Sequence, residues 1–192
     1  MRKWPFRPGG LAALVLLVSF SAAAHARGFH KKVAVVVHPT TVQVLVVMDI
    51  DGGGLRTQML RTGADANHDG LLDATEAQTL KAQLVDLARR PLQLSLSGYV
   101  LRPKLVDAKL GLRDDRRTSD TGLSIAAVLE APLPQPVFGG MELIVEDEAP
   151  DASHVRVEAE QDTGVPDAGP PPSAAADLQP GERLTLKLQS AM

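Results

Sequence analysis

Residues 33–49 read VAVVVHPTTVQVLVVMD, a valine-rich pattern that predicts a β fold. Valine recurs at every second position on both sides of His38 and Pro39, and this alternation is typical of β-strands. The four residues from His38 to Thr41 form the expected turn between two strands. Because the intervening positions are also largely apolar, we expect both faces of these strands to be covered.

The same alternation returns in several short runs after the middle of the chain. These runs begin near residues 92, 104, 123, 141 and 155. Turn signals separate them about every ten to fifteen residues, which is typical of an all-β sandwich. We therefore predict an immunoglobulin-like β-sandwich of about seven or eight strands over residues 27–162.

An amphipathic helix interrupts this β pattern. Its apolar residues recur at spacings of three and four, so they share one face of a helix from about residue 74 to residue 90. They are Ala77, Leu80, Leu84, Leu87 and Ala88. Pro91 ends the helix, and residues 55–62 before it are weakly helical. We expect an insertion at about residues 55–90, after the second strand.

The first 26 residues have the features of a secretory signal peptide. Arg2, Lys3 and Arg7 are basic, residues 11–20 are mainly apolar, and Ala24-His25-Ala26 is an A-x-A cleavage pattern. The alternative is a membrane anchor, but a spanning helix needs about 20 apolar residues. We expect cleavage after Ala26, no membrane span in the mature chain, and a periplasmic or secreted location.

Net charge and composition limit the classes of partner that this protein is expected to bind. The chain has 20 Lys and Arg against 23 Asp and Glu, and three of the basic residues lie in residues 1–26. The mature chain would therefore carry 17 basic and 23 acidic residues, a net charge of −6. Nucleic acids and anionic membranes need a basic face, so neither is an expected partner. Cysteine is absent, which excludes disulfides and thiolate metal sites.

Residues 65–76 read DANHDGLLDATE and resemble the EF-hand calcium loop over its full twelve residues. Calcium prefers six to eight oxygen ligands. The expected ligands are side-chain oxygens of Asp65, Asn67, Asp69, Asp73 and Glu76 and the backbone carbonyl of Leu71. Asp73 would act through water, and Glu76 would bind with both oxygens. The alternative is a polar turn capped by Asp73 ahead of the helix.

Two further positions of the loop agree with this resemblance. Gly70 stands at the sixth position, where a sharp turn favours glycine. Leu72 stands at the eighth, where EF-hands place an apolar residue that packs inward. A second ligand run begins at Asp49, but its twelfth residue is Leu60 instead of a glutamate. We therefore expect one Ca²⁺ ion and an entering helix of at most about two turns.

The layout is also similar to the extracytoplasmic N-terminal portion of some bacterial membrane proteins of the hydrogenase/urease-accessory type. The likeness covers roughly residues 30–105 and consists of strand, carboxylate loop, helix and strand behind a signal peptide. Those proteins continue into membrane spans, which we do not expect here.

The remaining polar clusters are expected to be structural. An acidic cluster near the end of the chain is predicted to be the solvated face of an edge strand rather than an acid–base site. It consists of Glu142, Glu146, Asp147, Glu148 and Asp151. His38 is expected in a turn, His68 in solvent, and residues 113–117 in a charged hairpin turn.

The C-terminal part is expected to leave the sandwich. Residues 164–181 contain five prolines, so we predict a linker over 163–181. Residues 182–192 alternate again and form either a returning strand or a disordered end.

These observations favour one function and leave an alternative open. No nucleophile or acid–base pair is recognisable, so we do not expect an enzyme. The leading expectation is an exported calcium-binding protein in which the ion clasps a loop and helix onto a β-sandwich. The alternative is an extracytoplasmic protein–protein interaction module with only structural calcium.

Overall fold

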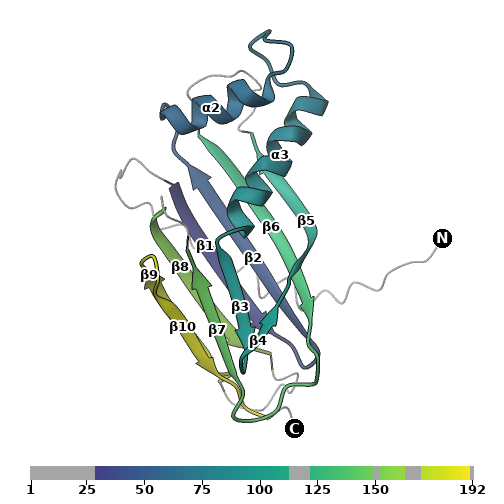
Figure 1. Ribbon diagram of the computed structural model, residues 1–192, viewed down its shortest axis with the longest axis vertical. Helices are drawn as coiled ribbons and strands as arrows, with labels where there is room; N and C mark the ends of the chain where they lie inside the picture. The colour runs from purple at the N-terminus through teal and green to yellow at the C-terminus, as the bar shows by residue number, and fades with distance from the viewer. Residues whose placement is uncertain (1–28, 113–121, 149–151, 163–169, 191–192) are drawn as a thin grey trace, which may run out of the picture.

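The computed structural model describes residues 29–112, 122–148, 152–162 and 170–190 (Figure 1). These residues form ten strands in two sheets and two helices. The arrangement confirms the predicted mainly β fold with two sheets, with more strands than expected. The predicted signal peptide at residues 1–26 and the charged turn at residues 113–117 lie outside the described residues.

The larger sheet has six strands in the order β5-β6-β2-β1-β8-β9. Its strands are β1 (Phe29–Val37), β2 (Thr41–Ile50), β5 (Lys104–Gly111), β6 (Leu123–Pro132), β8 (Ala152–Gln161) and β9 (Ser173–Leu178). The pair β1 and β8 is parallel, and the other neighbours are antiparallel.

The smaller sheet has four antiparallel strands in the order β10-β7-β3-β4. Its strands are β3 (Leu92–Leu96), β4 (Tyr99–Leu101), β7 (Glu142–Asp147) and β10 (Arg183–Lys187). The two sheets are linked through the helices, because the chain leaves the larger sheet after β2 and enters the smaller one at β3.

The valine-rich pattern of residues 33–49 forms the β1–β2 hairpin. Val33 lies opposite Val46 and Val35 opposite Val44. The turn between the strands is closed by a hydrogen bond of 2.8 Å from the His38 amide to the Thr41 carbonyl. The predicted strands and the predicted turn position of His38 are therefore confirmed.

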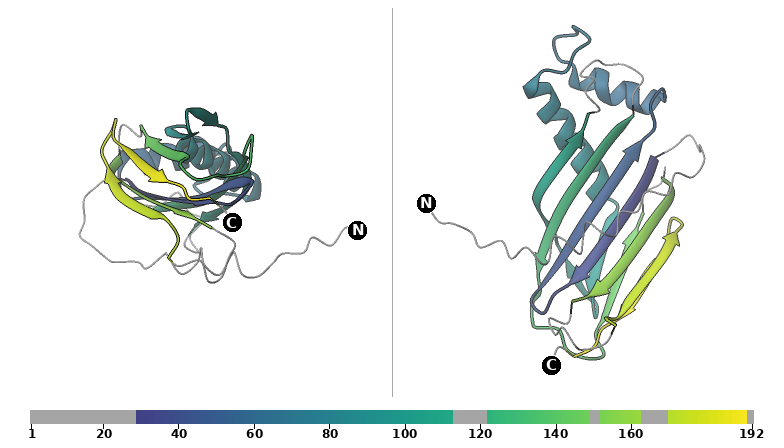
Figure 2. Two further views of the ribbon diagram at one scale, coloured as in Figure 1. Left: turned by 90° about the horizontal axis from the view of Figure 1, so that it is seen from below. Right: turned by 180° about the vertical axis from the view of Figure 1, so that it is seen from behind.

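The core lies between the two sheets, and the smaller sheet and the second helix cover the same face of the larger one (Figures 1 and 2). Buried residues on that face of the hairpin are Val33, Val35, Val37, Val42, Val44, Val46 and Met48. The opposite face carries Leu45 and Val47, which remain partly exposed. Val36 on this face is buried, with 8% exposure. The expectation that both faces are covered is therefore met only in part by the described residues, because α3 and the smaller sheet pack on one side.

The C-terminal part of the chain belongs to the sandwich. The predicted linker contains β9, which pairs with β8 and places Ala174 opposite Ala159. The small alanine side chains of β9 gave little apolar signal in the sequence. Residues 183–187 form β10, which pairs with β7, so the returning strand is the correct alternative. Residues 163–169 of the predicted linker lie outside the described part.

Neither of the two described helices is long and apolar enough to cross a membrane.

Candidate metal site

The twelve-residue loop connects helix α2 (Leu55–Ala64) to helix α3 (Ala74–Arg89) at one end of the molecule (Figure 1). The α3 boundaries confirm the helix predicted over residues 74–90. Helix α2 has ten residues, so it is longer than the two turns expected. The insertion after the second strand is where the sequence predicted it.

Helix α2 is attached to the end of the larger sheet by two buried polar side chains. Thr57 Oγ1 donates to the Asp51 carbonyl at 2.6 Å, just beyond β2. Arg61 Nη2 donates to the Gly122 carbonyl at 3.4 Å, just before β6. Both side chains are only 1% exposed. The start of the loop is therefore held by the sheet.

Asp65, the first predicted ligand, is buried at the end of α2 with 5% exposure. Its Oδ2 accepts a hydrogen bond of 3.0 Å from the Gly70 amide. Its Oδ1 is also buried and has no hydrogen-bond partner among the described residues. Gly70 has a φ of 77°, which confirms that the sixth position needs the left-handed turn. A buried carboxylate oxygen without a donor is costly, so this atom points to a missing cation or water.

Glu76, the last predicted ligand, reaches back from the first turn of α3 across the loop. Its Oε1 accepts from the amides of Ala66 at 2.9 Å and Asn67 at 3.3 Å. Its Oε2 accepts from the Asp73 amide at 2.9 Å. The side chain is 5% exposed. The loop is thus closed on itself by the carboxylate at its twelfth position.

Asp73 caps α3, as the capped-turn alternative predicts. Its Oδ1 accepts from the amides of Thr75 at 2.7 Å and Glu76 at 2.8 Å. Together with the return contact of Glu76, this forms a capping box. A capping box and a calcium ligand role are compatible, because Asp73 is exposed and its second oxygen accepts no hydrogen bond from described residues. That oxygen is free to hold the bridging water.

The middle of the loop is exposed and ordered by its own amides. Asn67 Oδ1 accepts from the Asp69 amide at 2.9 Å, and Asp69 Oδ1 accepts from the Leu71 amide at 2.8 Å. Asn67 Nδ2 also donates to Asp69 Oδ2 at 3.2 Å. The side chain of His68 is exposed and that of Leu72 is 1% exposed, as predicted for the fourth and eighth positions.

The structure brings Asp65 and Glu76 into the loop interior and leaves Asp69 and Asp73 on its rim. Among the described residues, no group of three or more His, Cys, Asp or Glu side chains is arranged to hold a metal ion. The loop carboxylates of Asp65, Asp69, Asp73 and Glu76 accept hydrogen bonds from backbone amides of the loop and of the start of α3. The donor set still fits calcium, because each carboxylate has about four acceptor sites and the amides use only some of them.

Residues Asp49 to Gly54, the second candidate run of calcium ligands, are not part of the loop at residues 65–76. Asp49 lies near the end of β2 opposite His30, and Asp51 contributes a carbonyl to the attachment of α2. These residues connect the sheet to the helix.

The acidic cluster is not the solvated edge that the sequence predicted. Strand β7 lies between β10 and β3, so it is not an edge strand. Asp147 is 1% exposed and pairs with Lys31 of β1, which is also 1% exposed. Asp151 lies outside the described residues. The sequence contained an indication of this pair. Lys31 is two residues from Val33 and Asp147 is two residues from Val145, so each charged residue is expected on the buried face of its strand.

Comparisons with known proteins do not assign the chain to a family. No protein-family model matches it, and no curated protein matches it.

Proposed function

We propose that this protein is an exported calcium-binding protein in which residues 65–76 bind one Ca²⁺ ion. The observation that supports the proposal most is Oδ1 of Asp65. This oxygen is buried, has no donor among the described residues, and stands at the first ligand position of the loop. A divalent cation bound in the loop would compensate the charge of this oxygen better than a backbone amide would.

The charge of the loop supports a hard cation. Asp65, Asp69, Asp73 and Glu76 place four carboxylates within twelve residues. Backbone amides carry only partial positive charge, so they compensate this repulsion incompletely. Calcium would supply two full charges and accept oxygens from Asp65, Asn67, Asp69 and the Leu71 carbonyl, with Glu76 closing the site. Its role here is to hold the loop and the start of α3 together.

Calcium titration of the mature protein should give a stoichiometry near one. The loop is exposed in its middle and its carboxylates are partly engaged, so we expect a dissociation constant of about 10⁻⁴–10⁻³ M. At about 1 mM calcium, a constant of about 10⁻⁴ M would stabilise the fold by about 1.4 kcal/mol. Isothermal titration and thermal melts with and without EDTA measure both quantities. No binding at millimolar calcium would refute the proposal.

Hydrogen exchange should show that calcium acts locally. Without the ion, the carboxylates repel and the loop opens, while Leu80 and Leu84 remain buried with 0% exposure and hold α3 on the sheet. Calcium should therefore raise protection within about residues 60–80 and leave residues 42–48 and 92–96 unchanged. Global loss of protection on chelation would show instead that the whole fold needs the ion.

A protein-interaction role is the second candidate function, and strands β4 and β5, which follow one another in the chain, support it. These are the outer strands of their sheets in the described part of the chain. Four of their apolar side chains are 45–65% exposed. They are Tyr99, Val100, Leu105 and Val106. Such edges can accept a strand from another protein.

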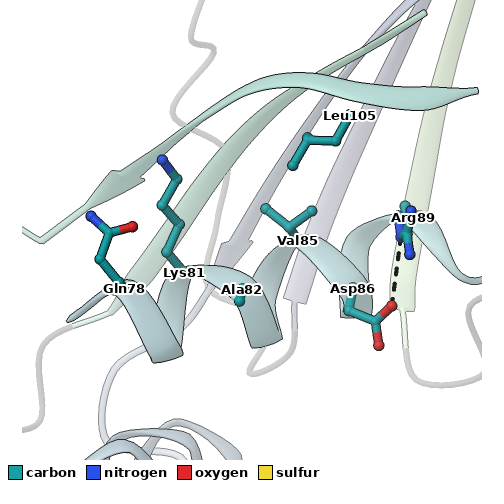
Figure 3. A pocket seen from close by; sticks show the side chains of 7 residues that line it. All are labelled: Gln78, Lys81, Ala82, Val85, Asp86, Arg89 and Leu105. Carbon is teal, nitrogen blue, oxygen red and sulfur yellow. Dashed lines mark ion pairs between the residues drawn. The ribbon is translucent and has the colours of Figure 1, made fainter. Parts of the chain in front are cut away.

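A groove beside β5 belongs to the same surface (Figure 3). Val85 of α3 and Leu105 of β5 face each other across it, and Lys81 and the Asp86–Arg89 ion pair line its rim. Replacing Val106 by aspartate separates the two candidates. It should weaken partner binding by an interaction module and leave calcium affinity unchanged.

A further inference from the structure

The two sheets are joined by a buried pair, Lys31 of β1 and Asp147 of β7. Both side chains are 0% exposed, and the residues are 116 positions apart in the sequence. Lys31 Nζ contacts Asp147 Oδ2 directly. The pair therefore connects the larger sheet to the smaller one through the core.

The surroundings of Lys31 are apolar. Lys31 lies in register with Met48 of β2 and Val155 of β8, which are 0% and 3% exposed. Val145, two residues before Asp147 on the same face of β7, is 0% exposed. Water is thereby kept from Lys31 Nζ, and burial disfavours the charged form of the lysine.

The site offers the lysine too few acceptors for a charged ammonium. A charged side chain has three N–H donors, and Asp147 is the only partner of Lys31 in the described part of the chain. Burial lowers the pKa of Lys31, and the attraction of Asp147 offsets this only in part.

We propose that Lys31 and Asp147 form an intramolecular amide bond that crosslinks the two sheets. One ammonium proton moves from Nζ to a carboxyl oxygen of Asp147, and the Nζ lone pair attacks Cγ to form a new N–C bond. The C–O bond to one carboxyl oxygen breaks. That oxygen leaves as water with its own proton and one from the amine. Nothing is oxidised or reduced, and the product keeps one neutral N–H in place of a charged group.

Intact mass of the purified, denatured protein tests the proposal directly. Loss of one water lowers the mass by about 18 Da relative to the mature sequence. The expected result is this loss in most of the folded wild-type protein. A mass equal to that of the sequence overturns the proposal and leaves a buried ion pair.

Peptide mapping excludes the other source of a lost water. Succinimides at Asp51-Gly52 or Asp69-Gly70 would give the same mass change. The crosslink alone protects Lys31 from trypsin and joins residues 28–32 to residues 118–156 in one branched peptide. Dehydration found only in linear peptides would overturn the proposal.

Two variants complete the experiment without depending on a stability measurement. Lys31→Arg keeps the charge and has no primary amine, so the 18 Da loss and the branched peptide should disappear. Lys32→Arg, at the neighbouring exposed position, should retain both. If Lys31→Arg does not fold, the wild-type peptide map alone decides. A branched peptide that persists in Lys31→Arg would assign the bond to another lysine.

Discussion

Replacing Glu76 by glutamine is expected to remove calcium binding at millimolar concentrations. The substitution removes the carboxylate that closes the loop. In the structure its Oε1 accepts from the Ala66 amide and its Oε2 accepts from the Asp73 amide. Loss of a residue that only supports a metal ligand already weakens affinity about 10–100-fold, so loss of a bidentate ligand should exceed about 100-fold. Isothermal titration of the variant measures this.

Glutamine is a suitable replacement because it keeps the local structure. A capping box accepts Glu or Gln at the third helical position, so the start of α3 should be retained. Asp86→Asn is the matched control, since it removes one negative charge from the same helix at its far end. Asp86 makes only partly exposed ion pairs with Arg89 and Arg90, so its loss should change affinity little. Equal calcium affinity in Glu76→Gln and wild type would exclude the EF-hand-like site.

Replacing Leu84 by alanine should have the largest effect on stability. Leu84 is 0% exposed and belongs to the apolar face with which α3 packs on β2, β5 and β6. Truncating a fully buried leucine costs about 2–5 kcal/mol through lost burial and the cavity that remains. Urea denaturation should therefore show a lower midpoint with an unchanged slope.

The same substitution at an exposed leucine provides the control. Leu55 of α2 is 74% exposed, so Leu55→Ala should change the free energy of unfolding by less than about 0.5 kcal/mol. An effect of Leu84→Ala as small as this would show that α3 is not packed on the sheet in solution. Calcium affinity of Leu84→Ala also reports whether the helix packing supports the loop.

Local features of this protein could be predicted from the sequence because neighbouring residues determine them. The spacing of Leu80, Leu84 and Ala88 predicts α3 and the face that it buries. Asp73 and Glu76 are three residues apart, so their capping box depends on one turn of chain. The β1–β2 hairpin follows from alternating valines and a four-residue turn. The positions of Gly70, His68 and Leu72 agree with the loop motif for the same reason.

The candidate metal site was predictable only in part. The sequence places six candidate ligand positions at the spacing of an EF-hand loop, but it does not say which side chains are buried or where their oxygens point. In the structure, Asp65 and Glu76 are inside the loop, whereas Asp69 and Asp73 are on its rim. Asp65 directly follows α2, which is held at the end of the sheet by Thr57 and Arg61 through the carbonyls of Asp51 and Gly122.

By itself, the sequence determined most of the strands, helix α3, the loop and the mainly β class, because each depends on the periodicity or spacing of adjacent residues. Only the tertiary structure decided which strands pair and which faces are covered. The parallel pairing of β1 with β8, the place of β9 at the edge, and the contact of Lys31 with Asp147 join residues far apart in the chain. Such contacts depend on how whole sheets bury their apolar faces, and no local pattern specifies that choice.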